Sequence, residues 1–253
     1  MQKQTWVLLR GLVREQRHWE AFPQVLAARL PDARIVMVDL PGNGVHCRER
    51  SPLRVRDMVD GLRADLAARD IPGPFSVLAL SLGAMIALEW MSHYPAEVER
   101  AVLVNTSLSA LNPFWQRLRP QNYGRIVRDV VFHHDPEARE RLILDITVNR
   151  VSDREVYVRR WVKYAEEQPV SLRNAIAQLV AAGTYRRPAR SPRCPVLVLN
   201  GQGDRLVDPR CSERVAAVFG LPLERHPTAG HDVALDAPDW LAERTAAFAA
   251  RTG

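Results

Sequence analysis

One stretch in the first third of the chain decides the fold: Val77-Leu78-Ala79-Leu80-Ser81-Leu82-Gly83-Ala84-Met85. An apolar run ends at a single serine, and helix-forming residues follow it directly. This pattern predicts a buried strand, a sharp turn and a helix, with the serine hydroxyl clear of the strand end. Such a turn brings the two backbones close together, so the residues two positions before and after the serine must be small. Ala79 and Gly83 meet this requirement.

Ser81 has two interpretations at this stage. At a strand-to-helix turn, a serine can be an exposed nucleophile, with the next backbone N–H aimed at a developing oxyanion. It can also be a plain helix cap, whose hydroxyl accepts a hydrogen bond from the helix that starts at Leu82. The residues further along the chain have to distinguish the two.

Similar apolar, β-branched runs recur along the chain, each bounded by turn residues. The predicted strands are Trp6–Leu9, Ile35–Val38, Phe75–Leu80, Ala101–Val104, Val196–Leu199 and a shorter Leu223–Arg225. Helical periodicity marks Trp19–Leu30, Leu53–Arg69, Leu82–Tyr94 and Leu241–Ala250. Strands that are apolar on both faces and alternate with helices predict an α/β fold, in which helices cover both faces of a mostly parallel sheet.

Residues 107–190 break this alternation. They contain no strand pattern of this kind, but they do contain helical patterns at Tyr123–Phe132, Asp135–Val148, Asp153–Glu167 and Ser171–Ala182. Asp135-Pro136-Glu137 is typical of a helix start, with a capping acid and a proline in the first turn. We therefore expect a core made of residues 1–106 and 191–253, with residues 107–190 inserted as a helical cap, or lid.

An acid and a histidine follow in the last quarter of the chain. Asp204 comes just after the predicted strand Val196–Leu199, and Asp208 four residues later is the second candidate. His231 lies in a loop after the last predicted strand. The chain order serine, acid, histidine is the order of the α/β-hydrolases and differs from the orders of chymotrypsin and subtilisin.

The chain resembles the α/β-hydrolase fold serine hydrolases over nearly its full length. Asp39-Leu40-Pro41-Gly42-Asn43-Gly44 is similar to a family loop that usually has histidine at the position of Asn43. Gly201-x-x-Asp204-x-x-Val207-x-Pro209 and Gly230-His231 are also similar to family motifs. The resemblance implies Ser81 as nucleophile, His231 as base and Asp204 as the residue that orients the base.

Arg10-Gly11-Leu12 departs from the family, whose first strand usually ends in His-Gly. Gly11 leaves room for an acyl oxygen, so we expect the backbone N–H groups of Leu12 and Leu82 to form the oxyanion hole. Among the aromatic residues of the cap, Phe114, Trp115 and Phe132 are predicted to line the substrate pocket together with Gly11. For His18, packing or capping is favoured over a place in that pocket.

The predicted activity is that of a carboxylic ester hydrolase, a serine esterase with a Ser-His-Asp triad, acting on a small acyl ester without a metal or organic cofactor. The chain resembles small bacterial esterases, including those that cleave the methyl ester of a pimeloyl chain held on acyl carrier protein. The triad alone leaves open a thioesterase, a C–C bond hydrolase, a cofactor-free haloperoxidase-like protein, or a hydrolase-fold protein that only binds.

Composition limits the alternatives further. With 47% hydrophobic and 25% charged residues, the chain is neither disordered nor of low complexity. Three cysteines without a Cys-x-x-Cys spacing favour a reduced, cytoplasmic protein. No apolar run approaches the ~18 residues that cross a bilayer, and none near the start resembles a signal peptide. His133-His134-Asp135 favours a solvated loop over a metal site.

The formal charge is +6, from 35 basic and 29 acidic residues. Residues 107–190 hold 15 of the basic and nine of the acidic residues, so the whole excess lies in the predicted cap. Arginine pairs such as Arg159-Arg160 would bind nucleic acid only with interleaved aromatic residues on one coherent face, so nucleic acid is not the favoured partner. We expect the basic cap to attract an anionic substrate or an acidic carrier protein.

Overall fold

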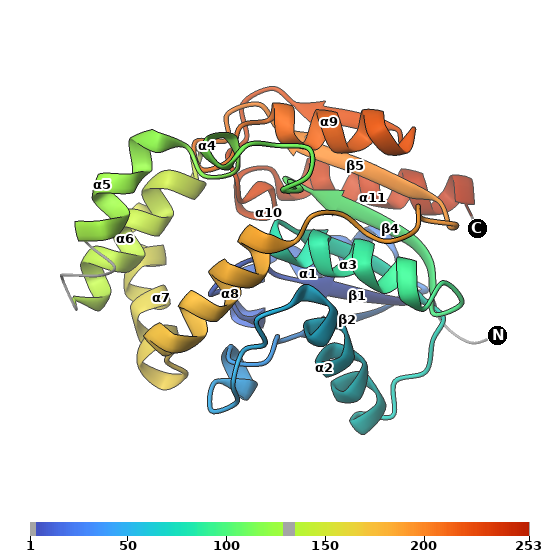
Figure 1. Cartoon of the computed structure of the whole chain (residues 1–253), viewed down its shortest axis with the longest axis horizontal. Helices are drawn as coiled ribbons and strands as arrows, with labels where there is room; N and C mark the ends of the chain where they lie inside the picture. Colours follow the sequence, from blue (N-terminus) through green and yellow to red (C-terminus); the bar gives the residue numbers. More distant parts are fainter. Residues whose placement is uncertain (1–3, 129–134, 253) are drawn as a thin grey trace.

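The computed structural model describes residues 4–128 and 135–252. Its centre is one parallel sheet with the strand order β2-β1-β3-β4-β5-β6 (Figure 1). The strands are β1 Thr5–Leu9, β2 Arg34–Val38, β3 Phe75–Leu80, β4 Val98–Val104, β5 Val196–Gly201 and β6 Leu223–His226. Each strand predicted from the sequence is present, and the predicted bounds differ from the observed ones by at most three residues.

The core helices lie on both sides of this sheet. They are α1 Phe22–Arg29, α2 Val55–Ala68, α3 Leu82–His93, α9 Arg210–Phe219, α10 Val233–Asp236 and α11 Pro238–Thr252. Trp6 and Leu8 of β1 belong to the cluster with α1 and α11, whereas Val7 and Leu9 belong to the cluster with α2 and α3. This alternation follows from the period of two in a strand, so β1 is apolar on both faces because both faces are buried.

Between β4 and β5 the chain forms helices and, in its described residues, no strand. These helices are α4 Phe114–Arg117, α5 Tyr123–Ile126, α6 Pro136–Thr147, α7 Arg154–Glu167 and α8 Leu172–Thr184. Figure 1 shows α5, α6 and α7 gathered at one end of the molecule, while α8 runs back toward the core. The helix start predicted at Asp135 is confirmed, since its carboxylate accepts from the Glu137 N–H at 2.9 Å.

Helices α6 and α7 share a small apolar core of their own. Its buried members are Leu144, Val148, Val158 and Trp161. At about 1.5–3 kcal/mol for each fully buried side chain, this cluster alone supplies limited stabilisation. The cap helices therefore also depend on their polar contacts with the core.

Gly83 lies where the start of α3 approaches the backbone at the end of β1, as the strand-to-helix turn requires. A Cβ atom at this position would lie 2.6 Å from the Leu9 carbonyl oxygen and 2.8 Å from that of Arg10. We expect Gly83→Ala to lower the free energy of unfolding by about 1–3 kcal/mol, measured by urea denaturation, because these backbone atoms cannot move aside. The matched control is Gly183→Ala in α8, where nothing lies within 4 Å of a built Cβ. The control should be neutral or stabilise by up to about 1 kcal/mol. Equal effects in the two variants would contradict the constraint.

Candidate active site

Ser81 lies between the end of β3 and the start of α3, with φ +59° and ψ −115°. A positive φ in a residue other than glycine costs of order 1–3 kcal/mol and persists only where surrounding contacts enforce it. The Ser81 side chain makes no capping hydrogen bond to the helix. The helix-cap interpretation is therefore wrong, and the hydroxyl remains available at a strained turn.

Gly11 approaches this turn from the end of β1. A Cβ atom on Gly11 would lie 3.1 Å from Ser81 Cβ and 3.6 Å from Ser81 Oγ. The short segment that carries Leu12 thus passes beside the serine, while Leu82 begins the helix on its other side. The structure therefore places Ser81 between the Gly11-Leu12 segment and Leu82, the two segments predicted to supply the oxyanion hole.

His231 and Asp204 meet in the interior although 27 residues separate them in the chain. Their Nδ1 and Oδ2 atoms are 2.7 Å apart, and the two side chains are 5% and 1% exposed. Asp204 Oδ1 accepts the backbone N–H groups of Leu206 and Val207, each at 2.8 Å. An ionised carboxylate can only accept, so the His231 Nδ1–H donates and Nε2 keeps its lone pair.

Asp208, the second candidate for the acid, has a different partner. Its carboxylate binds the Arg210 guanidinium at 2.5 Å and accepts the Arg210 backbone N–H at 3.0 Å. The Arg210 guanidinium lowers the pKa of Asp208 below its ordinary value. Of the two acids, Asp204 is therefore the one in contact with His231.

Asn105 is a site residue that sequence reasoning missed. It follows β4 with φ +47°, a conformation that asparagine tolerates better than most residues. Its amide nitrogen donates to the carbonyls of Gly230 and His231, at 3.0 and 2.8 Å, and its oxygen accepts from Gly201 N–H at 2.9 Å. One side chain therefore ties the histidine loop to the end of β5. The available signal was an asparagine directly after a buried strand.

Asp236 holds the other side of the same loop. Its carboxylate accepts the N–H groups of Gly230 at 2.6 Å, Asn149 at 2.9 Å and Arg150 at 2.7 Å. Burial raises the pKa of Asp236 even though these donors favour its charged form. Since Asn149 and Arg150 follow α6, this acid fastens the cap to the loop that carries His231. This role could not be predicted from the sequence, because the N–H groups of Asn149 and Arg150 are backbone groups 87 and 86 residues away.

Arg10, at the position where the family usually has histidine, forms a buried ion pair with Asp232. The two Nη–Oδ distances are 3.2 and 2.6 Å, and both residues are at most 4% exposed. The guanidinium also lies 4.8 Å from the centre of the Trp19 ring. The pair joins the Gly11 segment to the residue after His231. Arg10 thus connects two loops of the site through its side chain.

With this geometry in view, the chain was compared with known proteins. The sequence profile of the alpha/beta hydrolase family matches residues 6–244. The chain belongs to the alpha/beta hydrolase family. The predicted family and its fold, a parallel sheet flanked by helices, are therefore both confirmed.

Two curated relatives are each 27% identical to this hydrolase. One is the biotin biosynthesis bifunctional protein BioHC of Teredinibacter turnerae; the match covers 89% of this chain but spans only 41% of that protein. The other is a pimeloyl-[acyl-carrier protein] methyl ester esterase of Aromatoleum aromaticum, matched over 94% of this chain and 95% of that protein. These relatives support the prediction of a carboxylic ester hydrolase.

Among solved structures, the hydrolase is similar to BpoC of Mycobacterium tuberculosis, named a non-heme bromoperoxidase. The TM-score is 0.79 at 24% identity, covering 100% of this chain and 94% of that one. At this identity the similarity shows the fold alone. No helix within residues 4–128 or 135–252 is long and apolar enough to span a membrane.

Gln178 of α8 fastens the cap to the loops around Gly11. It is fully buried, its oxygen accepts the Val13 N–H at 2.8 Å, and its nitrogen donates to Asn43 Oδ1 at 2.6 Å and Ser51 Oγ at 3.0 Å. Asn43 in turn donates to the Arg14 carbonyl at 2.8 Å. Asn43, which replaces the usual histidine of its family loop, thus links Gln178 to the segment that follows Leu12.

His18 packs against the cap, as favoured from the sequence. Its ring lies 5.4 Å from the rings of Trp161 and Tyr164, and its Nε2 is 3.0 Å from Arg14 Nη1. Arginine can only donate, so Nε2 accepts and Nδ1 carries the proton. Arg14 also pairs with Glu140 of α6 at 2.6 Å. His18 therefore has a structural role in the contact between core and cap.

Of the three aromatic residues predicted to line the pocket, the structure describes two. Phe114 and Trp115 on α4 are 53% and 62% exposed. The Phe114 ring lies 5.9 Å from the Tyr123 ring, and neither α4 residue is enclosed. Phe132 and the pair His133-His134 lie outside the described residues. A pocket role for these residues stays a prediction.

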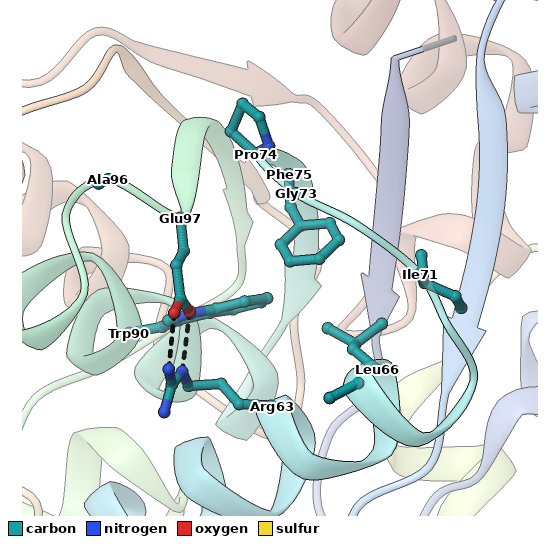
Figure 2. A pocket seen from close by; sticks show the side chains of 10 residues that line it. Arg63, Leu66, Ile71, Gly73, Pro74, Phe75, Trp90, Ala96 and Glu97 are labelled. Atoms are coloured by element: carbon teal, nitrogen blue, oxygen red, sulfur yellow. Dashed lines mark hydrogen bonds and ion pairs between the residues drawn. The ribbon is translucent and has the colours of Figure 1, made fainter. Parts of the chain in front are cut away.

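A pocket of about 410 Å³ lies away from the serine (Figure 2). Its wall includes Phe75, the first residue of β3, whereas Ser81 follows the last residue of that strand. Arg63 and Glu97 close one side through two bonds of 2.8 and 2.6 Å, and Trp90 Nε1 donates to the same carboxylate. At about 3.3 Å per residue, the pocket is roughly 20 Å from Ser81 along β3. It is therefore not the active site.

His18 gives the hydrolase a pH-dependent stability. Burial, and then the charge of Arg14, hold the pKa of His18 well below 6.5, whereas the unfolded chain titrates near that value. Below pH 6.5 the unfolded state binds more protons than the native state, so this group lowers the free energy of unfolding as pH falls. The loss should be roughly 1 kcal/mol over the first pH unit. In urea denaturation at pH 5.5 and 7.5, His18→Gln should be less pH-sensitive than the wild type. An unchanged pH dependence would contradict a buried, neutral His18.

Gln178 should matter for stability more than an exposed glutamine does. Gln178→Met removes the acceptor of the Val13 N–H and the donor for Asn43 and Ser51, leaving buried polar groups without partners. We expect the free energy of unfolding to fall by about 2 kcal/mol or more. The control is Gln202→Met, an exposed site with one short-range side-chain bond, which should change it by about 0.5 kcal/mol or less. Similar losses in the two variants would show that the buried bonds add little.

Proposed function

We propose that this hydrolase cleaves a carboxylic ester through Ser81, His231 and Asp204. The observation that carries the proposal is the buried 2.7 Å contact between His231 and Asp204, on the same edge of the sheet as a serine whose hydroxyl caps nothing. Strain at the serine and saturation of the acid by backbone donors are typical of a preorganised site. Membership of the alpha/beta hydrolase family supports the same assignment.

The roles follow from the chemistry of the three side chains. Asp204 holds the His231 ring through Nδ1–H, which leaves the Nε2 lone pair to accept the Ser81 proton. Ser81 Oγ then attacks the ester carbonyl carbon, and the C–O bond to the alcohol breaks as the protonated His231 returns its proton to the leaving oxygen. A water molecule deprotonated by His231 hydrolyses the acyl-serine and restores the enzyme.

The carbonyl oxygen gains negative charge in each of these steps. The N–H groups of Leu12 and Leu82 are the proposed donors to that oxygen, since they flank Ser81 from β1 and from α3. Gly11 lies so close to Ser81 Oγ that a side chain there would fill the space an acyl group needs. Loss of one such donor typically costs about 10²–10³ in rate. These steps require no metal or organic cofactor.

An acyl chain on a carrier protein is the finer proposal for the substrate. It is supported by the similarity to a pimeloyl-[acyl-carrier protein] methyl ester esterase and by the positive charge of residues 107–190. A thioesterase, a C–C bond hydrolase and a cofactor-free haloperoxidase-like activity would use the same triad. A panel of p-nitrophenyl esters of increasing chain length, run beside acyl-thioesters, distinguishes an esterase from a thioesterase and gives the preferred chain length.

The triad assignment predicts a steep loss of activity on substitution. Ser81→Ala and Asp204→Asn should each lower kcat/KM for a p-nitrophenyl ester by about 10⁴-fold. The control Asp208→Asn changes the neighbouring acid, which is buried, pairs with the exposed Arg210 and has no hydrogen bond or ion pair with His231, and should leave kcat/KM within a factor of about three. If Asp208→Asn were the damaging variant, the assignment of Asp204 would be wrong.

A fluorophosphonate probe separates an enzyme from a protein that only binds. The wild type should be labelled covalently at Ser81, and Ser81→Ala should not be labelled. Wild-type protein that is folded by circular dichroism and fails to label would overturn the enzymatic proposal.

A further inference from the structure

One face of α8 exposes large aliphatic side chains to solvent. Leu172, Ile176, Leu179 and Val180 are 52%, 52%, 49% and 40% exposed. Their spacing of four, seven and eight residues places them on one side of the helix. The opposite side is buried against the core through Asn174, Ala177, Gln178 and Ala181. The apolar stripe therefore points away from the protein's own interior, and contiguous exposed apolar surface of this kind often marks an interaction site.

A core loop in contact with α8 also exposes aliphatic side chains. Val45 and Leu53 of this loop are 61% and 59% exposed. Asn174 holds the loop against α8, because it accepts the Ser51 N–H at 3.0 Å and donates to the Glu49 carbonyl at 2.9 Å. The exposed aliphatic side chains of α8 and of this loop, Leu172, Ile176, Leu179, Val180, Val45 and Leu53, are called here the α8 face.

Arginines without partners lie on the same helix and the same loop. In the described part of the chain, no hydrogen bond or ion pair involves the exposed side chains of Arg48, Arg50, Arg54 or Arg173. Residues 168–203 contain five arginines and no acidic residue. Glu49, the one acid within residues 40–56, is paired with His46 at 2.8 Å. The α8 face therefore has an apolar centre and an uncompensated basic rim.

Most arginines of the other helices between β4 and β5 are different, although Arg159 of α7 is also exposed and without a hydrogen bond or ion pair among the described residues. Arg125 and Arg154 both pair with Asp145, at 2.9 and 2.7 Å, and Arg141 pairs with Glu137 at 2.7 Å and with Glu155. The positive excess counted over residues 107–190 is therefore largely neutralised on α6 and α7. On α8 and the adjoining core loop, by contrast, Arg173, Arg48, Arg50 and Arg54 have no such partner among the described residues.

We propose that the α8 face docks an acidic carrier protein that delivers the acyl ester to Ser81. This inference rests on the proposed esterase function and names the surface through which the partner binds. The buried side of the same helix contacts the segment beside Leu12 through Gln178 and the Val13 N–H, at 2.8 Å. A partner on the α8 face thus lies about one helix diameter, roughly 10 Å, from the segment that carries the proposed oxyanion donor.

The charges and side chains of the face favour this occupant over two others. A second copy would bring arginines against arginines in a symmetric contact, which is repulsive. A membrane-surface helix usually has a polar side that is exposed and rich in Lys and Arg. Residues 172–184 contain one basic residue, Arg173, and the side of α8 that carries Asn174 and Gln178 is buried. An apolar centre with a charged rim is the usual anatomy of a protein–protein interface.

The test compares a carrier-linked ester with a small ester. The variants are Arg50→Glu/Arg173→Glu, which reverses the rim, and Ile176→Ser, which interrupts the stripe. For pimeloyl-acyl-carrier-protein methyl ester, each should lower kcat/KM by about tenfold or more, whereas for p-nitrophenyl butyrate kcat/KM should stay within about twofold. The control Arg34→Glu introduces a negative charge at an exposed arginine at the start of β2 and should leave both substrates unaffected.

Each other outcome overturns a definite statement. A wild type inactive on both substrates refutes the proposed function itself. A wild type active on the small ester alone, or variants as active as the wild type on the carrier-linked ester, refutes the docking surface while leaving the esterase intact. Variants that instead lose binding to phosphatidylglycerol vesicles, or that change from dimer to monomer in sedimentation, assign the face to a membrane or to a second copy and refute a carrier partner.

Discussion

The sharp turn at Ser81 constrains the structure more than any other feature. The turn requires the start of α3 to lie against the end of β1, where the carbonyl of Leu9 comes within 2.6 Å of a built Gly83 Cβ. That contact requires β1 to be the neighbour of β3, as the strand order shows. It also brings Gly11 beside Ser81. A positive φ at the serine is tolerated because these backbone contacts leave the chain no relaxed alternative.

The parallel sheet brings the loops of the proposed site to one edge, and hydrogen bonds of buried polar side chains then fix these loops in place. Asn105 and Asp236 hold the histidine loop from two sides, and Gln178 holds the segment after Leu12. Each of these side chains binds backbone N–H or C=O groups, so it fixes the path of the loop backbone itself. An unmet buried group costs about 1–3 kcal/mol, so a loop displaced from its donors would be strongly disfavoured. The proposed site is therefore held mainly by residues that would not take part in its chemistry.

The sequence was sufficient to predict the sheet and most of the longer helices and to propose the three catalytic residues, but it did not predict α9. Burial on both faces produces continuous apolar runs, and β3 was predicted residue for residue from such a run. The residues that hold the loops were not predicted, because their partners are distant in the chain. Gln178 meets Val13 across 165 residues, and Asn105 meets His231 across 126. The hydrophobic periodicity of a short stretch of sequence carries no information about such distant pairs. The sequence identifies Arg10 only as a departure from the usual histidine of the family. Its pairing with Asp232 is seen only in the structure.

A count of charged residues in the sequence likewise does not show which charges are paired in the structure. A count over residues 107–190 treats Arg141 and Arg173 alike, yet one is matched by two glutamates and the other has no partner among the described residues. Only the second kind contributes a field at the surface, because a paired charge is largely cancelled beyond a Debye length of about 8 Å. The net value of +6 is thus a poor guide to where an acidic molecule would bind. Arginines left over after pairing are a better guide, and four of them lie on α8 or on the loop that it contacts, where α8 exposes an apolar stripe on one side and holds the Val13 N–H on the other.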